Sequence, residues 1–176
     1  IPINERIGLF DRKMRVINEN CNDKDTWIKW SIRALKSVYG YEFQGDSVLI
    51  ARENLLYDYM DYYEARFGEK TPLSLLKEIA NIIAWNIWQM DGLKGVVPYS
   101  CHEIKETFHQ MNLFEETEEE INTMCPGCAK NDIFGHTGIY CRIYDWTNLN
   151  KSIRFIDVLK EGARLWKNLN KPIAIS

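Results

Sequence analysis

Cysteines are the residues whose type and spacing best fit a defined chemistry. Cys125 and Cys128 form a Cys-Pro-Gly-Cys turn, and the Pro and Gly between them let two thiolates converge on one metal ion. A tetrahedral zinc site needs four nitrogen or sulfur ligands. Cys141 is the natural third ligand and Cys101 the fourth. The pattern therefore predicts zinc held by Cys101, Cys125, Cys128 and Cys141.

Two histidines and two other interpretations compete with this ligand set. His102 and His136 lie in the same stretch and can replace a cysteine. A redox dithiol is less favoured, because Cys-Pro-Gly-Cys follows a polar, acidic stretch and not a buried strand. Cysteines packed in a loop without metal are the remaining alternative. If zinc binds, we expect it to be structural, since this stretch has too few apolar residues to fold alone.

Two carboxylates follow short apolar runs and form a second candidate site. Glu42 lies near the end of the run at residues 38–43, and Asp91 follows the run at residues 85–89. An acid at the end of a buried strand must meet water, a hydrogen-bond donor or a ligand, because burying it unpaired is costly. The alternative is a solvated acid or a helix cap. Glu42 is the stronger candidate of the two.

The elements around these acids must position them. Both apolar runs are predicted strands, and the stretch between them predicts a long helix that Gly68 ends and a second one that Thr71-Pro72 begins. In open α/β sheets, ligands bind beyond the carboxyl ends of the strands. Two acids placed there can hold a nucleoside, one on the ribose and one on the base. Trp85 and Trp88 on one strand favour a central strand in a three-layer sheet.

The other predicted elements frame this unit. Apolar residues recur at helical spacing over residues 3–17 and 27–35, which predicts two amphipathic helices. Residues 101–141 are interpreted as a polar insertion with helical pieces near 103–110 and 116–124. A strand at 139–144 and a last helix at 157–169 complete the pattern.

Composition narrows the function classes. The chain has 176 residues, 45% of them hydrophobic and 27% charged, which fits one globular domain. A formal net charge of −3 argues against a large basic surface as the sole basis for nucleic-acid binding, though not against a local basic patch. No apolar run approaches the length of a membrane helix. An odd number of cysteines with one Cys-x-x-Cys fits a reducing compartment, and we expect the cytoplasm.

Two blocks of this sequence resemble a known family. Residues 38–56, with Tyr39-Gly40-Tyr41-Glu42 before Ala51-Arg52-Glu53-Asn54-Leu55, resemble the second conserved block of N6-adenine DNA methyltransferases. Residues 86–93, Asn-Ile-Trp-Gln-Met-Asp-Gly-Leu, resemble their third block. The resemblance is closest to M subunits of restriction–modification systems and covers residues 1–95 best.

The resemblance implies a cofactor and roles for four residues. Glu42 would accept hydrogen bonds from the ribose hydroxyls of S-adenosylmethionine, and Asp91 from the adenine amino group. Phe43 and Met90 would contact the faces of the adenine ring. A carboxylate is a two-oxygen acceptor suited to a diol, and apolar side chains offer a stacking surface.

Two family motifs are missing from this sequence. The glycine-rich loop that holds the methionine part of the cofactor is absent, and no Asn-Pro-Pro-Tyr or Asp-Pro-Pro-Tyr follows Asp91; Val97-Pro98-Tyr99 only partly matches. The resemblance therefore implies a fragment, or one half of a split enzyme that is inactive alone and completed by a second subunit or segment.

The expected architecture is α/β. Residues 1–100 are expected to form a partial Rossmann-like class I methyltransferase core, 101–141 a zinc-stapled insertion, and 142–176 the C-terminal part of the core. The expected function is a DNA adenine methyltransferase component that binds S-adenosylmethionine and acts on DNA. The rival hypothesis is a non-catalytic, zinc-containing interaction module that binds a partner subunit or nucleic acid.

Overall fold

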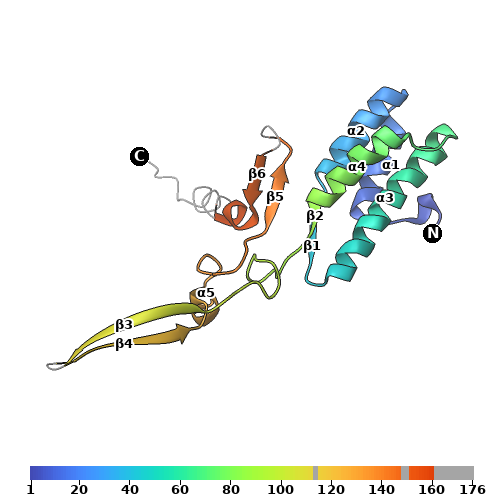
Figure 1. The fold of residues 1–176 in the computed structure, drawn as a ribbon. Helices are drawn as coiled ribbons and strands as arrows, with labels where there is room; N and C mark the ends of the chain where they lie inside the picture. Colours follow the sequence, from blue (N-terminus) through green and yellow to red (C-terminus); the bar gives the residue numbers. More distant parts are fainter. Residues whose placement is uncertain (113–114, 148–150, 161–176) are drawn as a thin grey trace, which may run out of the picture. The chain divides into compact units, whose positions relative to one another are not determined.

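The computed structural model describes residues 1–112, 115–147 and 151–160, and these form a mixed α/β protein with small sheets (Figure 1). The chain divides into two compact units. The first comprises residues 1–89 and 144–151, and the second comprises residues 90–143 and 152–176. In the described part of the chain, no helix has the length and apolar character needed to cross a membrane.

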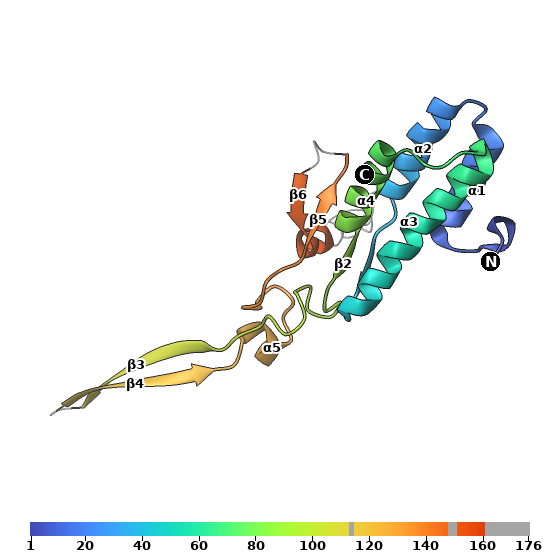
Figure 2. The same ribbon diagram turned by 45° about the vertical axis from the view of Figure 1, so that its right-hand side comes forward.

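Four helices build the first unit, and all four were predicted from the sequence. After a short 3-10 turn at Ile3–Glu5 come α1 (Leu9–Asn20), α2 (Lys24–Lys36), α3 (Gly45–Phe67) and α4 (Leu73–Asn86). Figure 2 shows them as neighbouring rods; α1 packs on α2 and α3, and α4 packs on α2 and α3.

Local chemistry sets the ends of these helices. The Asp11 carboxylate accepts a hydrogen bond from the Gly8 N–H (3.0 Å), and the Asp23 carboxylate accepts one from the Thr26 N–H (2.8 Å). Each satisfies a backbone donor that has no partner in the first helical turn. Gly68 ends α3 in the left-handed conformation, at φ 68°, which glycine adopts without strain.

An aromatic cluster forms the core between the helices. Trp27 of α2 is fully buried and contacts three rings edge-on or tilted, at centroid distances of 5.2–6.0 Å. Those rings all lie on α3: Tyr59, Tyr63 and Phe67. Such geometries are the preferred ones for aromatic pairs, so this cluster helps to fix α2 and α3 to each other.

The predicted strand–helix–strand order is confirmed, with each strand shorter than predicted. Strand β1 (Gly40–Glu42) pairs in parallel with β2 (Ile87–Gln89), with Glu42 opposite Gln89 and with α3 and α4 between them in the chain. The predicted central strand in a three-layer sheet is wrong for the described residues, where this sheet has two strands. Trp85 belongs to α4 and stacks on Tyr144 at 4.5 Å between ring centroids.

The second unit contains an antiparallel hairpin where the sequence predicted helical pieces. Strands β3 (Ile104–Asn112) and β4 (Glu115–Thr123) pair from Ile104↔Thr123 to Asn112↔Glu115. The helical prediction is wrong because glutamate-rich segments have good helix propensity, a weak preference that tertiary contacts override. Here the base of the hairpin is fixed, and the Thr123 hydroxyl donates to the Ile104 carbonyl at 3.2 Å.

The remaining elements are short. Helix α5 (Pro126–Lys130) follows the hairpin, and β5 (Arg142–Asp145) pairs with β6 (Lys151–Arg154). The strand predicted at 139–144 overlaps β5. Residues 155–160 are helical, in agreement with the start of the predicted last helix, whose remaining part lies outside the described residues.

Candidate metal centre

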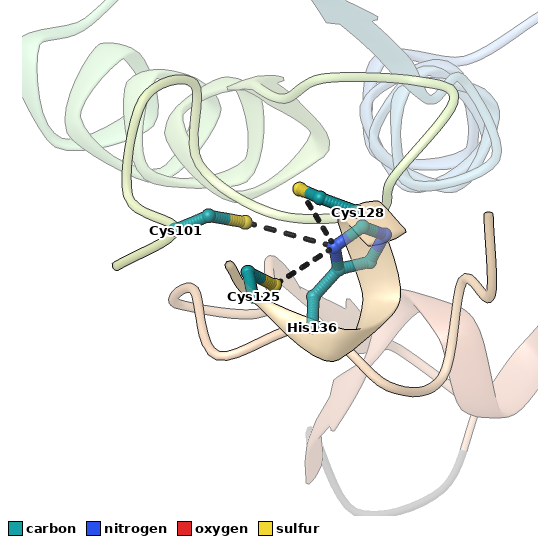
Figure 3. A group of neighbouring side chains, drawn as sticks. All are labelled: Cys101, Cys125, Cys128 and His136. Atoms are coloured by element: carbon teal, nitrogen blue, oxygen red, sulfur yellow. Dashed lines mark hydrogen bonds between the residues drawn. The ribbon is translucent and has the colours of Figure 1, made fainter. Parts of the chain in front are cut away.

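Three of the four predicted cysteine ligands lie together, and a histidine completes the group. Cys101, Cys125, Cys128 and His136 offer ligand atoms that all lie within 4.8 Å of one another (Figure 3). The Nδ1 atom of His136 is 3.6 Å from the sulfurs of Cys101 and Cys125 and 3.7 Å from that of Cys128. These residues form a group able to hold a metal ion such as zinc.

The three distances from His136 match those expected around a tetrahedral ion. Zinc lies about 2.3 Å from a cysteine sulfur and about 2.0–2.1 Å from a histidine nitrogen, so the sulfur–nitrogen edge of a regular tetrahedron is about 3.6 Å. The three observed edges are 3.6, 3.6 and 3.7 Å. A single imidazole nitrogen has one proton or one lone pair and cannot bond three sulfurs at once. One shared cation would account for all three distances.

The Cys-Pro-Gly-Cys turn places two of the ligands. Cys125 caps α5 and Pro126 opens it, which puts Cys128 within its short span. A Cβ atom on Gly127 would come within 2.6 Å of the backbone nitrogen of His136 and 2.7 Å of the carbonyl carbon of Gly135. Only glycine lets these two segments approach, and the Gly127 N–H donates to the Gly135 carbonyl at 2.9 Å.

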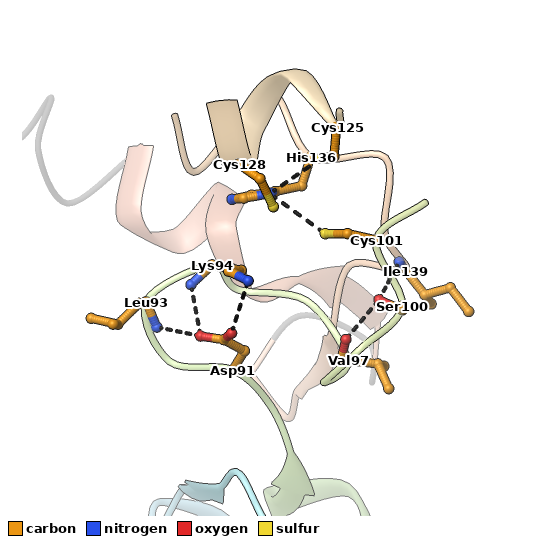
Figure 4. Close-up of polar contacts among 10 residues, drawn as sticks. All are labelled: Asp91, Leu93, Lys94, Val97, Ser100, Cys101, Cys125, Cys128, His136 and Ile139. Atoms are coloured by element: carbon orange, nitrogen blue, oxygen red, sulfur yellow. Dashed lines mark hydrogen bonds and ion pairs between the residues drawn. The ribbon is translucent and has the colours of Figure 1, made fainter. Parts of the chain in front are cut away.

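A pair of side-chain contacts joins the loop of Cys101 to the loop of His136. The Thr137 hydroxyl donates to the His102 carbonyl (2.6 Å) and accepts from the His102 N–H (3.1 Å). The Ser100 hydroxyl donates to the Val97 carbonyl and accepts from the Ile139 N–H (Figure 4). The four ligands come from three separate segments, and these bonds hold two of the segments in register.

Hydrogen bonds tune the thiol of Cys125. Burial raises its pKa, but the N–H of Thr137 at 3.3 Å, the backbone of Cys128 and the His136 ring lower the pKa to about 5. For Cys101, burial and the neighbouring thiols of Cys125 and Cys128 raise the pKa to about 11. A cysteine must lose its proton to bind a metal ion, so metal binding by this group would release protons.

Cys141, which the sequence predicted as a ligand, is not part of this group. His136 takes its place. Cys141 is buried, with its N–H donating to the Gly95 carbonyl and its carbonyl accepting from the Phe155 N–H. Burial raises the pKa of its thiol to about 11. A clue to His136 is present in the sequence, since Gly135 and Gly138 flank it and allow the tight turns that bring it back to α5.

The predicted nucleoside-binding residues lie at or just after the strand ends. Glu42 ends β1, is exposed, and accepts the Phe43 N–H at 2.8 Å; the Phe43 carbonyl accepts from the Gln89 amide at 3.0 Å. Met90 is fully buried. The Asp91 carboxylate accepts the N–H groups of Leu93 and Lys94 at 3.1 and 3.3 Å and lies 3.6 Å from the Lys94 ammonium (Figure 4).

Comparisons with known proteins identify no relative: no family model, curated protein or solved structure matches this chain.

Proposed function

We propose that this chain is the adenosine-binding part of an S-adenosylmethionine-dependent DNA adenine N6-methyltransferase of a restriction–modification system. The supporting observation is the parallel pairing of β1 and β2, which sets Glu42 opposite Gln89 and begins α3 three residues after Glu42. This is the order of elements that the resemblance of residues 38–56 and 86–93 implies.

The chemistry of Glu42 supports the ribose role. Its carboxylate is exposed and uses one oxygen on the Phe43 N–H. A carboxylate has about four acceptor positions, so capacity remains for a diol. Asp91 uses one oxygen on the turn at Leu93 and Lys94, which leaves the other, near the Lys94 ammonium, for an amino group.

Two features of the chain support a partner. Parallel sheets occur almost only where both faces are covered and usually have more strands than two, whereas the described residues supply only β1 and β2 to this one. The catalytic Pro-Pro-Tyr type motif is also absent from the sequence. Transfer of a methyl group to an extruded adenine amine would therefore need a complex with a second subunit or segment.

Zinc in this proposal is structural. A site with four protein ligands is closed, and structural zinc sites are of this kind. Cys101 precedes β3 by three residues and Cys125 follows β4 by two, so a metal ion there would join the two ends of the hairpin.

Calorimetric titration of S-adenosylmethionine and S-adenosylhomocysteine into the chain tests the proposal. We expect binding that Glu42→Ala abolishes and that Glu53→Ala, which removes an exposed carboxylate from α3, leaves unchanged. If neither nucleotide binds, or if both variants behave alike, the adenosine-binding proposal is wrong.

The second candidate function is a zinc-containing interaction module without a cofactor. The observation that favours it is the cluster of Cys101, Cys125, Cys128 and His136, which needs no nucleotide to explain it. Stoichiometric metal in a chain that ignores both nucleotides would support this alternative.

A further inference from the structure

Helix α2 carries a row of cations on its exposed side, with a groove on either flank. Lys29, Arg33 and Lys36 stand at positions i, i+4 and i+7, which share one helix face. The groove toward α1 is lined by Arg12, Lys13, Val16, Trp30 and Arg33, among others. The groove on the other flank is lined by Lys29, Arg33, Lys36, Tyr39 and Trp146, among others. Arg33 borders both.

Aromatic rings alternate with these cations. The Arg33 guanidinium lies 5.1 Å from the Trp30 ring centroid, and the Lys36 ammonium lies 5.1 Å from that of Trp146. Trp30 is 45% exposed and Tyr39 is 41% exposed. Large rings with this much accessible surface, each beside a positive charge, offer stacking platforms next to sites for anions.

The cations have no acidic partners among the described side chains. Among residues 1–105, 122–147 and 151–160, no carboxylate forms an ion pair with Arg12, Lys13, Lys29, Arg33 or Lys36. The helix dipole favours Arg33 and Lys36 in the last turn of α2. It disfavours Arg12, which lies in the first turn of α1. The helix dipole therefore does not explain why all five cations gather here.

Asp145 is an acid near Tyr39, and two bonds to Thr147 occupy one of its oxygens. Burial raises the pKa of Tyr39, and the charge of Asp145 adds to this shift. The chain as a whole has a net charge of −3. Five cations gathered on two adjacent helices thus form a local exception to the charge of the molecule.

We propose that the α2 face, defined as Arg12, Lys13, Lys29, Trp30, Arg33 and Lys36, binds a single strand of DNA, with phosphates on the cations and a base on Trp30. The choice of DNA rests on the proposed function. An anionic membrane fits less well, because a membrane-surface helix must insert an apolar face, and the apolar face of α2 (Trp27 and Leu35) is buried in the core.

Fluorescence anisotropy of a labelled 20-nucleotide oligo-dT, over a series of salt concentrations and without nucleotide cofactor, tests this. The double variant Lys29→Gln/Arg33→Gln should lower the magnitude of the log–log salt slope by about 1.4, since each contact to a single strand contributes about 0.7. Counterion release alone then predicts affinity about 60-fold lower at about 50 mM salt, relative to a reference of about 1 M.

A matched control removes the same charge elsewhere. Lys70→Gln/Lys77→Gln neutralises two exposed lysines, one before α4 and one on it, and should keep the slope and affinity. Trp30→Ala should weaken binding by about 5-fold or more through lost stacking, with an unchanged slope. Circular dichroism checks that each variant is folded.

Three outcomes would overturn the inference: no binding at low salt, equal losses in the two double variants, or vesicles with anionic lipid that bind through the α2 face while oligo-dT does not. Titration of S-adenosylmethionine into Lys29→Gln/Arg33→Gln separates this inference from the proposed function. Because the α2 face does not include Glu42, that titration should match the unsubstituted chain. If the unsubstituted chain binds oligo-dT but not S-adenosylmethionine, only the proposed function is wrong.

Discussion

Replacement of His136 by alanine is the sharpest test of the metal centre. Structural zinc sites in small peptides bind with about 10–16 kcal/mol of free energy, or about 2.5–4 kcal/mol for each of four ligands. Loss of one ligand should therefore weaken zinc binding by about 100- to 1,000-fold. His136 supplies the nitrogen that lies 3.6–3.7 Å from three sulfurs, so its removal leaves a three-sulfur site.

The control is Cys141→Ser, which changes a buried cysteine outside the group. Competition with a chromophoric chelator measures affinity in both variants, and the thiolate-to-metal charge-transfer band of the cobalt-substituted protein reports the number of thiolates. We expect three thiolates in the unsubstituted chain, the same three after Cys141→Ser, and a large affinity loss only after His136→Ala. If Cys141→Ser loses the metal and His136→Ala keeps it, the assignment of His136 as the fourth ligand is refuted.

Three further predictions concern the first unit. Tyr62→Phe removes the hydroxyl that donates to the buried Asp11 carboxylate at 3.0 Å, and should lower the free energy of unfolding by about 1.5–3 kcal/mol in urea titration. Burial raises the pKa of Tyr59 and Tyr62 to about 12. Because the pKa of a tyrosine in the unfolded chain is about 10, the raised pKa stabilises the fold below about pH 10, and this stability is lost as the pH rises through about 12. Ultraviolet titration should therefore show these two phenols ionising at a higher pH than free tyrosine, together with alkaline unfolding. Asn86→Leu leaves the Leu35 and Val38 carbonyls and the Trp146 indole without their amide partner, and should cost about 3–5 kcal/mol by the same urea measurement, with unchanged metal binding.

The sequence was most informative where the spacing of apolar residues agreed with the residues that begin or end a helix or strand. Gly68 ended α3 as predicted, and the apolar runs around Glu42 and before Asp91 became paired parallel strands. These features depend on short-range chemistry: a left-handed cap, a helical stripe, an extended apolar run. Trp85 was misassigned because its run of apolar residues fits the end of a buried helix as well as it fits a strand, and periodicity alone cannot separate the two.

The hairpin was not predicted, and His136 was predicted only as a substitute for a cysteine; the two outcomes share one physical cause. Residues 104–123 carry glutamates that favour a helix, so their pairing as β3 and β4 depends on what holds Ile104 beside Thr123. The neighbouring residues in the chain are Cys101 and Cys125, both in the metal group. An isolated two-stranded hairpin is marginal in water, and an ion that joins its two ends removes much of the entropy cost of closing it. The sequence favoured Cys141 and offered His136 as a substitute, whereas in the fold the loop of His136 returns to α5, where Gly127 and Gly135 allow a close approach. The metal and the hairpin are therefore expected to form together, and any variant that empties the site should also unpair the strands.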